Sequence, residues 1–73
     1  MSNHNVLGII GGGQLGSMLC QAAKKLGVKT VIYCDDKNSP AQNYSNKFIC
    51  SKYNDETKIE EFANQVDVVT FEF

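Results

Sequence analysis

A run of glycines between an apolar segment and an amphipathic one constrains this chain more than any other feature. Residues 11–16 read Gly-Gly-Gly-Gln-Leu-Gly and separate the apolar segment 6–10 from the amphipathic segment 15–26. Glycines at a strand-to-helix joint allow a tight turn and a close approach of the backbone to a ligand. The first N–H groups of the helix also present the positive end of its dipole to an anion. Residues 11–16, the glycine loop, are therefore predicted to be a ligand-binding turn.

The apolar pattern on either side of the loop predicts alternating strands and helices. Strands are expected at residues 6–10, 28–34, 47–50 and 66–71, and helices at 15–26 and after the capping pair Asn54 and Asp55. The spacing of apolar residues predicts which face of each helix is buried. In the first helix these residues are Leu15, Met18, Leu19, Ala22, Ala23 and Leu26, and in the second they are Ile59, Phe62, Ala63 and Val66.

Right-handed connections between these strands predict an α/β fold with a parallel sheet of order 3-2-1-4 and helices on both faces. Ligands of such sheets bind beyond the carboxyl ends of the strands, where the strand order reverses. The first and fourth strands flank that point. We therefore expect Gln14 of the glycine loop and Glu72, which follows the fourth strand, to face one another across a site.

Composition limits the chain to one small domain, residues 1–73, with 42% hydrophobic and 21% charged residues. Seven lysines are scattered along the chain, and the sequence contains no arginine, so we expect no nucleic-acid partner. The N-terminus lacks a signal peptide and no apolar run could span a membrane, which favours a cytoplasmic protein without membrane contacts. Cys20, Cys34 and Cys50 form no C-x-x-C pair, so we expect buried reduced thiols and no metal site.

Two classes of ligand remain open from the residues alone. The spacing Gly11-x-Gly13-x-x-Gly16 fits the dinucleotide fingerprint, and Asp35 and Asp36 follow about 20 residues later, where an acid would bind a ribose of NAD. This pattern indicates an NAD(P)-binding fragment of an oxidoreductase. The alternative for the two acids is a solvated turn after the strand.

Three motifs in order resemble a family of ATP-grasp ligases of purine biosynthesis, the 5-(carboxyamino)imidazole ribonucleotide synthases. This enzyme is also called the ATPase subunit of phosphoribosylaminoimidazole carboxylase. The motifs are the glycine loop followed by Met18-Leu19, the segment 38–42 (Asn-Ser-Pro-Ala-Gln), and the segment 67–73 (Asp-Val-Val-Thr-Phe-Glu-Phe). The resemblance covers essentially the whole chain and implies its N-terminal, Rossmann-like pre-ATP-grasp domain.

The resemblance implies that this domain helps to hold 5-aminoimidazole ribonucleotide against a following ATP-grasp domain, which binds ATP and magnesium. The family enzyme activates bicarbonate with ATP and carboxylates the substrate's exocyclic amine. Gln14, Leu15 and Glu72 match its substrate-contacting positions, and Gly11, Gly12, Gly13 and Gly16 allow the close approach to a phosphate or to other groups. No catalytic residue is expected in this chain, and the full-length family implies a possible homodimer.

Two departures from the family pattern shape the expectation for this chain. Relatives commonly carry Arg or Lys after the last glycine of the loop, whereas Ser17 offers at most a hydroxyl here. The final motif ends at Phe73, before its second acid, so we expect a C-terminally truncated domain without the ATP-grasp domain. Such a fragment would be inactive alone, would need the remainder in trans, and would be marginally stable or self-associating because its fourth strand is uncovered. A remnant without function is the third alternative.

Overall fold

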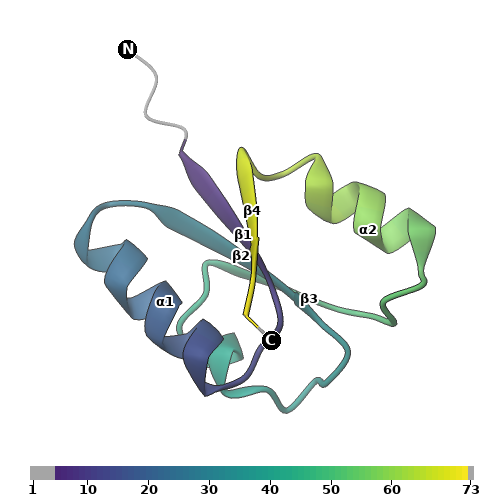
Figure 1. Cartoon of the computed structure of the whole chain (residues 1–73), viewed down its shortest axis with the longest axis horizontal. Helices are drawn as coiled ribbons and strands as arrows, with labels where there is room; N and C mark the ends of the chain where they lie inside the picture. Colours follow the sequence, from purple (N-terminus) through teal and green to yellow (C-terminus); the bar gives the residue numbers. More distant parts are fainter. Residues whose placement is uncertain (1–4, 73) are drawn as a thin grey trace.

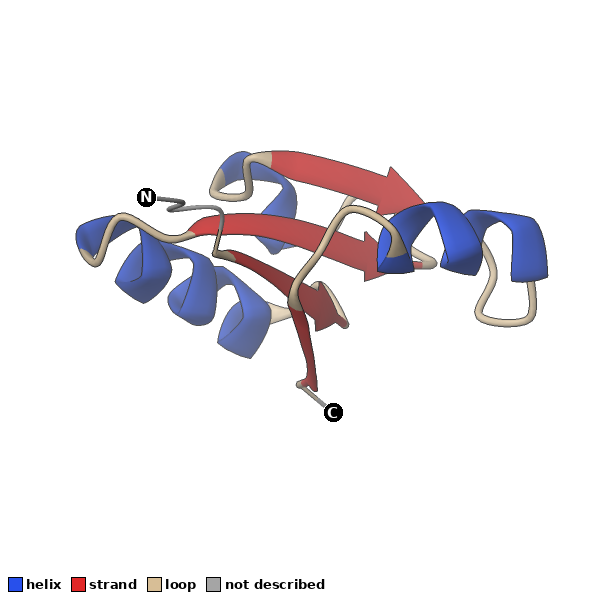
Figure 2. Cartoon of the chain, turned by 90° about the horizontal axis from the view of Figure 1, so that it is seen from above, coloured by secondary structure: helices blue, strands red, loops and turns tan. Residues whose placement is uncertain are grey.

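Four parallel strands form the centre of the structure, a computed structural model that describes residues 5–72. The strands are β1 (Val6–Ile10), β2 (Lys29–Cys34), β3 (Lys47–Cys50) and β4 (Val68–Phe71). They are connected by the helices α1 (Gln14–Lys25) and α2 (Glu56–Ala63) and by one 3₁₀ turn, η1 (Pro40–Asn43). Their order β3-β2-β1-β4, with every pair parallel, confirms the predicted topology (Figures 1 and 2). Residues 1–4 and Phe73, the last residue of the final motif, lie outside the described residues.

Each face of the sheet carries its own apolar core, because successive side chains of a strand point to opposite faces. On the α1 face the buried residues are Ile9, Cys20, Ile32, Cys34 and Ala41. On the other face Phe62 of α2 packs with Val31, Tyr33 and Ile49 of the strands. The rings of Phe62 and Tyr33 meet edge-to-face, with 5.5 Å between ring centroids. These two cores confirm that helices cover both faces.

The buried face of α1 differs from the predicted one. Leu15, Met18 and Leu26 are 53%, 58% and 79% exposed, and Ala22 is exposed as well. The buried residues are instead the small ones: Gly16, Ser17, Cys20 and Ala23. The helix packs against both β2 and η1, and only small side chains allow it to approach two neighbours closely. The prediction was therefore wrong about Leu15, Met18, Ala22 and Leu26, whereas Ala23 is buried and Leu19 packs against the core as expected.

Smaller corrections concern the second helix and the cysteines. Ala63 is exposed rather than buried, and β4 begins at Val68, two residues later than expected. Cys50 is exposed, because it is the last residue of an edge strand, so the expectation of a buried thiol was wrong there. Cys20 and Cys34 are buried, and this burial raises the pKa of both thiols above the ordinary value.

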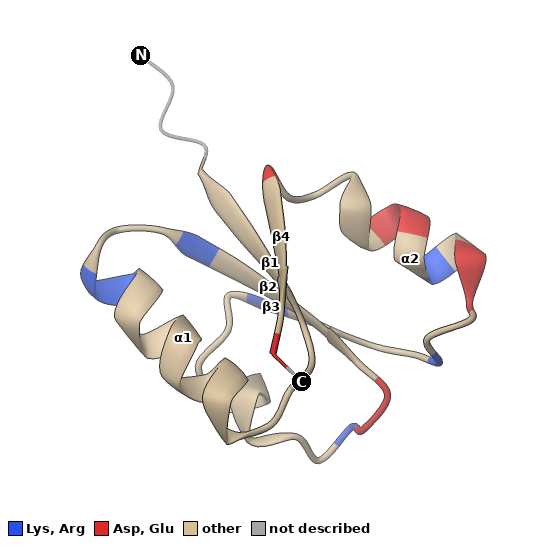
Figure 3. Cartoon of the chain, in the orientation of Figure 1, with Lys and Arg blue, Asp and Glu red and all other residues tan. Residues whose placement is uncertain are grey.

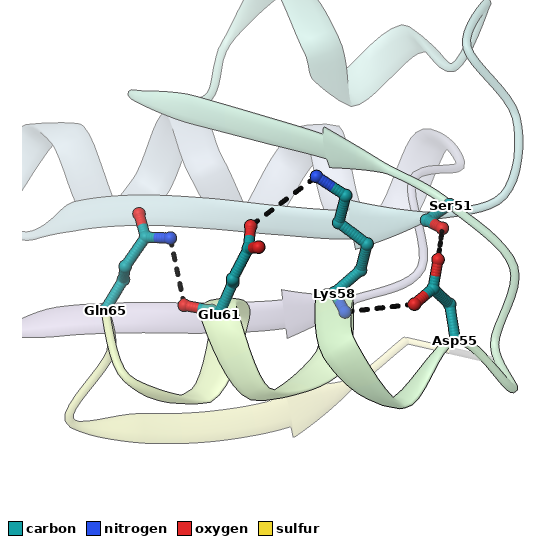
Figure 4. Close-up of polar contacts among 5 residues, drawn as sticks. All are labelled: Ser51, Asp55, Lys58, Glu61 and Gln65. Atoms are coloured by element: carbon teal, nitrogen blue, oxygen red, sulfur yellow. Dashed lines mark hydrogen bonds and ion pairs between the residues drawn. The ribbon is translucent and has the colours of Figure 1, made fainter.

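The N-terminus of α2 is capped as the sequence predicts (Figure 4). The carboxylate of Asp55 accepts a hydrogen bond from the backbone N–H of Lys58 at 3.1 Å and another from the hydroxyl of Ser51 at 2.7 Å. These bonds favour the ionised carboxylate, and the pKa of Asp55 is lowered, chiefly by Ser51 and then by the Lys58 N–H. The ion pair between Lys58 and Glu61, at 3.6 Å and half exposed, adds little.

Acid should weaken the cap of α2. Because the pKa of Asp55 is lowered on folding, its stabilisation is present above the unfolded value of about 3.9 and is lost as the pH falls through the lower folded value. We expect Asp55→Ala to lower the thermal midpoint at neutral pH and to flatten the acid limb of a plot of midpoint against pH. The matched control is Glu60→Ala, an exposed carboxylate of the same helix. Equal acid limbs in the wild type and Asp55→Ala would contradict this role.

The outer edge of β4 exposes apolar side chains. Val68, Val69 and Phe71 are 61%, 41% and 62% exposed, and β4 pairs only with β1 within residues 5–72. An exposed apolar edge strand is a template for pairing with another strand.

Within the described part of the chain, no helix has the length and apolarity needed to cross a membrane.

Isolated chains should associate through this edge. We expect sedimentation velocity to show a concentration-dependent dimer, and we expect Val68→Lys to shift the chain toward monomer, since a charge on an edge strand opposes pairing. The matched control is Leu26→Lys, which places a charge on an exposed apolar residue of the α1 flank. A wild-type chain that stays monomeric at all concentrations would refute association through β4.

Candidate functional site

The glycine loop is held between the carboxyl ends of β2 and β4. The N–H of Gly11 donates to the carbonyl of Tyr33 at 2.8 Å, on the β2 side. On the opposite side, the N–H of Glu72 donates to the carbonyl of Ile10 at 3.1 Å. These bonds continue the pairing of β1 with both neighbours and bring the end of β4 to the loop. The structure thus confirms that the fourth strand ends beside the glycines.

The glycines are required because neighbouring parts of the chain press against the loop. A Cβ atom on Gly12 would lie 2.8 Å from the Sγ of Cys34 and would overlap Ser39. Gly11 has a φ of +120° and, with a Cβ, would come within 2.6 Å of the Cγ of Glu72. Any side chain at either position would therefore displace its neighbour.

The side chain of Glu72, which follows β4, lies at the N-terminus of α1. Its Oε1 accepts a hydrogen bond from the backbone N–H of Gly13 at 3.2 Å, and the residue is partly buried. A carboxylate at this position is stabilised by the positive end of the helix dipole. The anion expected at the loop is thus supplied, at Gly13, by a carboxylate of the chain itself.

Gln14 and Leu15 begin α1 next to this contact and are exposed. In the described part of the chain no hydrogen bond joins Gln14 to Glu72, and neither Gln14 nor Leu15 lines the adjacent cavity. The carboxylate of Glu72 instead contacts Gly13, one residue before Gln14. Substrate binding by Gln14 and Leu15 stays a prediction.

A cavity of about 190 Å³ opens beside the glycine loop at the carboxyl end of the sheet. It is lined by residues 11–13, 34–36, 39–40, Tyr53 and Glu72. Figure 3 shows the acidic segments in red after β2 and β4. The lining contains the carboxylates of Asp35, Asp36 and Glu72 and no Lys or Arg. Such a wall attracts hydrogen-bond donors and repels anions.

Asp35 and Asp36, the two acids of the dinucleotide hypothesis, play different parts. The Oδ1 of Asp36 accepts from the N–H of Asn38 at 2.9 Å and so stabilises the turn after β2. This matches the alternative interpretation of a solvated turn. Asp35 is exposed at the cavity.

Tyr53 lines the cavity although sequence reasoning did not select it, and so does Ser39, which belongs to the motif 38–42 but was not predicted as a site residue. Burial, followed by the charge of Asp35, raises the pKa of the Tyr53 hydroxyl. The ring centroid of Tyr53 lies 6.0 Å from that of Tyr33. Tyr53 could have been predicted from its position three residues after β3, because the carboxyl ends of all parallel strands meet at one edge of the sheet. Among residues 5–72, no group of three or more His, Cys, Asp or Glu side chains could hold a metal ion.

A doubly wound parallel sheet with a glycine turn at the reversal of strand order defines a Rossmann-like domain. A family model described as the ribonucleotide synthetase preATP-grasp domain matches residues 4–73. The chain belongs to this family.

Curated relatives agree with this assignment. The chain is 41% identical over 69 residues to the N5-carboxyaminoimidazole ribonucleotide synthase of Staphylococcus haemolyticus, covering 94% of this chain and 18% of that protein. It is 40% identical over 67 residues to the chloroplastic phosphoribosylaminoimidazole carboxylase of Vigna aconitifolia, covering 92% of this chain and 12% of that protein. The chain thus spans under a fifth of the length of these relatives. Neither is an oxidoreductase by name, so the dinucleotide alternative gains no support.

Solved structures share the fold. The N5-carboxyaminoimidazole synthetase of Staphylococcus aureus complexed with ADP is 40% identical, with a TM-score of 0.91. The match covers 94% of this chain and 18% of that one. The N5-carboxyaminoimidazole ribonucleotide synthetase of Thermotoga maritima is 35% identical, with a TM-score of 0.87, and the match covers 94% of this chain and 19% of that one. The whole described sheet is therefore a fold that this family uses.

Two alanine substitutions in the glycine loop should differ in cost. Gly12→Ala places a Cβ 2.8 Å from the Sγ of Cys34, so we expect a destabilisation of about 1–3 kcal/mol in urea unfolding. Gly13 has an extended backbone that alanine can adopt, and a Cβ there would lie 3.3 Å from the nearest atom of Glu72. We therefore expect Gly13→Ala to lower the free energy of unfolding by less. Equal losses for the two variants would show that contact with Cys34 and Ser39 does not restrict Gly12.

Proposed function

We propose that this chain forms the substrate-binding pre-ATP-grasp part of a cytoplasmic ligase that carboxylates 5-aminoimidazole ribonucleotide with ATP and bicarbonate. Family membership and the names of the relatives support this reaction. The observation that carries the proposal is the carboxylate of Glu72, which the N–H of Gly13 holds at the cavity.

Glu72 orients the substrate in this proposal. Its Oε1 accepts from Gly13, and a carboxylate has further lone pairs, so it can also accept from the amine or a ribose hydroxyl of the substrate. Gln14 can both donate and accept at the adjoining turn, and Leu15 supplies apolar contact. All three residues act by positioning, so none has to transfer a proton.

ATP and magnesium belong to the following ATP-grasp domain in this proposal. The cavity lining contains three carboxylates and no Lys or Arg, so the phosphates of ATP, like the phosphate of the substrate, must be neutralised by groups outside this cavity. The glycines of the loop provide the close approach of the backbone. The isolated chain would then bind substrate weakly and would need the remaining domains for carboxylation.

A titration of the ¹⁵N-labelled chain separates the two ligand classes. We expect 5-aminoimidazole ribonucleotide to shift the amide signals of Gly13, Gln14 and Glu72, and NAD to shift none. Glu72→Gln should weaken binding about 10- to 150-fold, because a hydrogen bond to a charged group contributes about 1.5–3 kcal/mol. Glu60→Gln, an exposed carboxylate of α2, should bind as the wild type does.

The opposite pattern would overturn the proposal. Shifts of Asp35 and the glycine loop with NAD, together with no response to 5-aminoimidazole ribonucleotide, would indicate the dinucleotide-binding class. No response to either ligand would indicate a remnant without this function.

A further inference from the structure

One peptide group connects η1 to Glu72. The carbonyl of Gly12 accepts hydrogen bonds from the hydroxyl of Ser39 and from the N–H of Ala41, the latter at 3.2 Å. The N–H of the same peptide group, that of Gly13, donates to Glu72 at 3.2 Å. The two ends of a single planar unit are thus held by η1 and by the residue after β4.

Ser39 is built into the fold so that its hydroxyl points at this peptide. The residue is only 4% exposed and precedes η1 in an extended conformation, which the following Pro40 favours. Its N–H donates to the carbonyl of Asp36 at 3.2 Å. The missing side chain of Gly12 leaves the space that the hydroxyl fills.

We propose that Ser39 is a positioning residue for Glu72 and acts through the Gly12–Gly13 peptide group. A hydrogen bond accepted by the carbonyl of a peptide polarises that peptide and strengthens its N–H as a donor. The same bond fixes the plane of the peptide, and with it the direction in which the Gly13 N–H points. Ser39 thereby sets the orientation of the carboxylate without lying in contact with it. Its importance for the ligase rests on the proposed function of Glu72.

The contrasting role for Ser39 is packing alone, with no influence on Glu72. Loss of stability in Ser39→Ala fits both roles, so the decisive measurement must report on the Gly13 N–H. The proton chemical shift of that amide does so, because it moves upfield when the hydrogen bond that the amide donates weakens.

The first experiment compares ¹⁵N-labelled variants of this chain without ligand. We expect Ser39→Ala to move the Gly13 amide proton upfield, and Ser39→Cys, whose thiol is bulkier than the hydroxyl but still a weak donor, to move it in the same direction by less. The matched control is Ser45→Ala, because the buried Ser45 hydroxyl has no hydrogen-bond partner among the described residues. A Gly13 signal unchanged in Ser39→Cys overturns the inference, even if Ser39→Ala fails to fold.

The second experiment measures substrate binding. Ser39→Ala should weaken the binding of 5-aminoimidazole ribonucleotide about fivefold in the wild-type background, the effect of one ordinary hydrogen bond. It should have no further effect in a Glu72→Gln background, since both substitutions act on one contact. Independent, multiplying losses would show that Ser39 does not act through Glu72. If the chain binds no substrate, the proposed function fails, while the ligand-free amide shift still decides the link between Ser39 and Glu72.

Discussion

The site depends on the double pairing of β1. This strand lies between β2 and β4, and its hydrogen bonding continues one residue beyond its end on both sides, through the Gly11 N–H and the Ile10 carbonyl. Two neighbours therefore determine where the chain leaves the sheet. The glycine loop cannot shift toward β2 or β4 without breaking one of these bonds, and an unpaired polar group at this depth costs free energy. A register shift of β4 would move Glu72 away from the loop as well.

Small side chains on α1 provide the second half of the arrangement. Gly16, Ser17, Cys20 and Ala23 let the helix lie close to both the sheet and η1. That closeness places the start of η1 against the loop, where the Ala41 N–H reaches the Gly12 carbonyl. Larger residues on this face would separate η1 from the loop. Leu15 and Met18, which lie off this face, are exposed as a consequence.

Sequence reasoning succeeded where local chemistry decides the structure. The apolar runs, the cap at Asp55 and the handedness of parallel connections were sufficient for the strand order and for the position of Glu72. Prediction from the sequence failed where tertiary contacts decide which residues are buried. The periodicity of α1 marks a wide apolar arc, but the position of η1 selects which part of it is buried, and that position cannot be found from α1 alone. Tyr53 was missed for the same reason, since its relation to the cavity follows from how the loop after β3 folds.

The carboxylate of Glu72 changes the meaning of the glycine pattern. In a dinucleotide-binding turn, the N–H groups at the start of the helix are left for a pyrophosphate. Here the Gly13 N–H already donates to Glu72, and a pyrophosphate at that place would have to displace this carboxylate and overcome its repulsion, together with that of Asp35. Glycines with the same spacing thus hold a carboxylate of the chain itself here, whereas in a dinucleotide-binding turn they bind the pyrophosphate of a ligand. The choice between the two depends on a residue outside the loop, Glu72, which follows β4 and contacts Gly13.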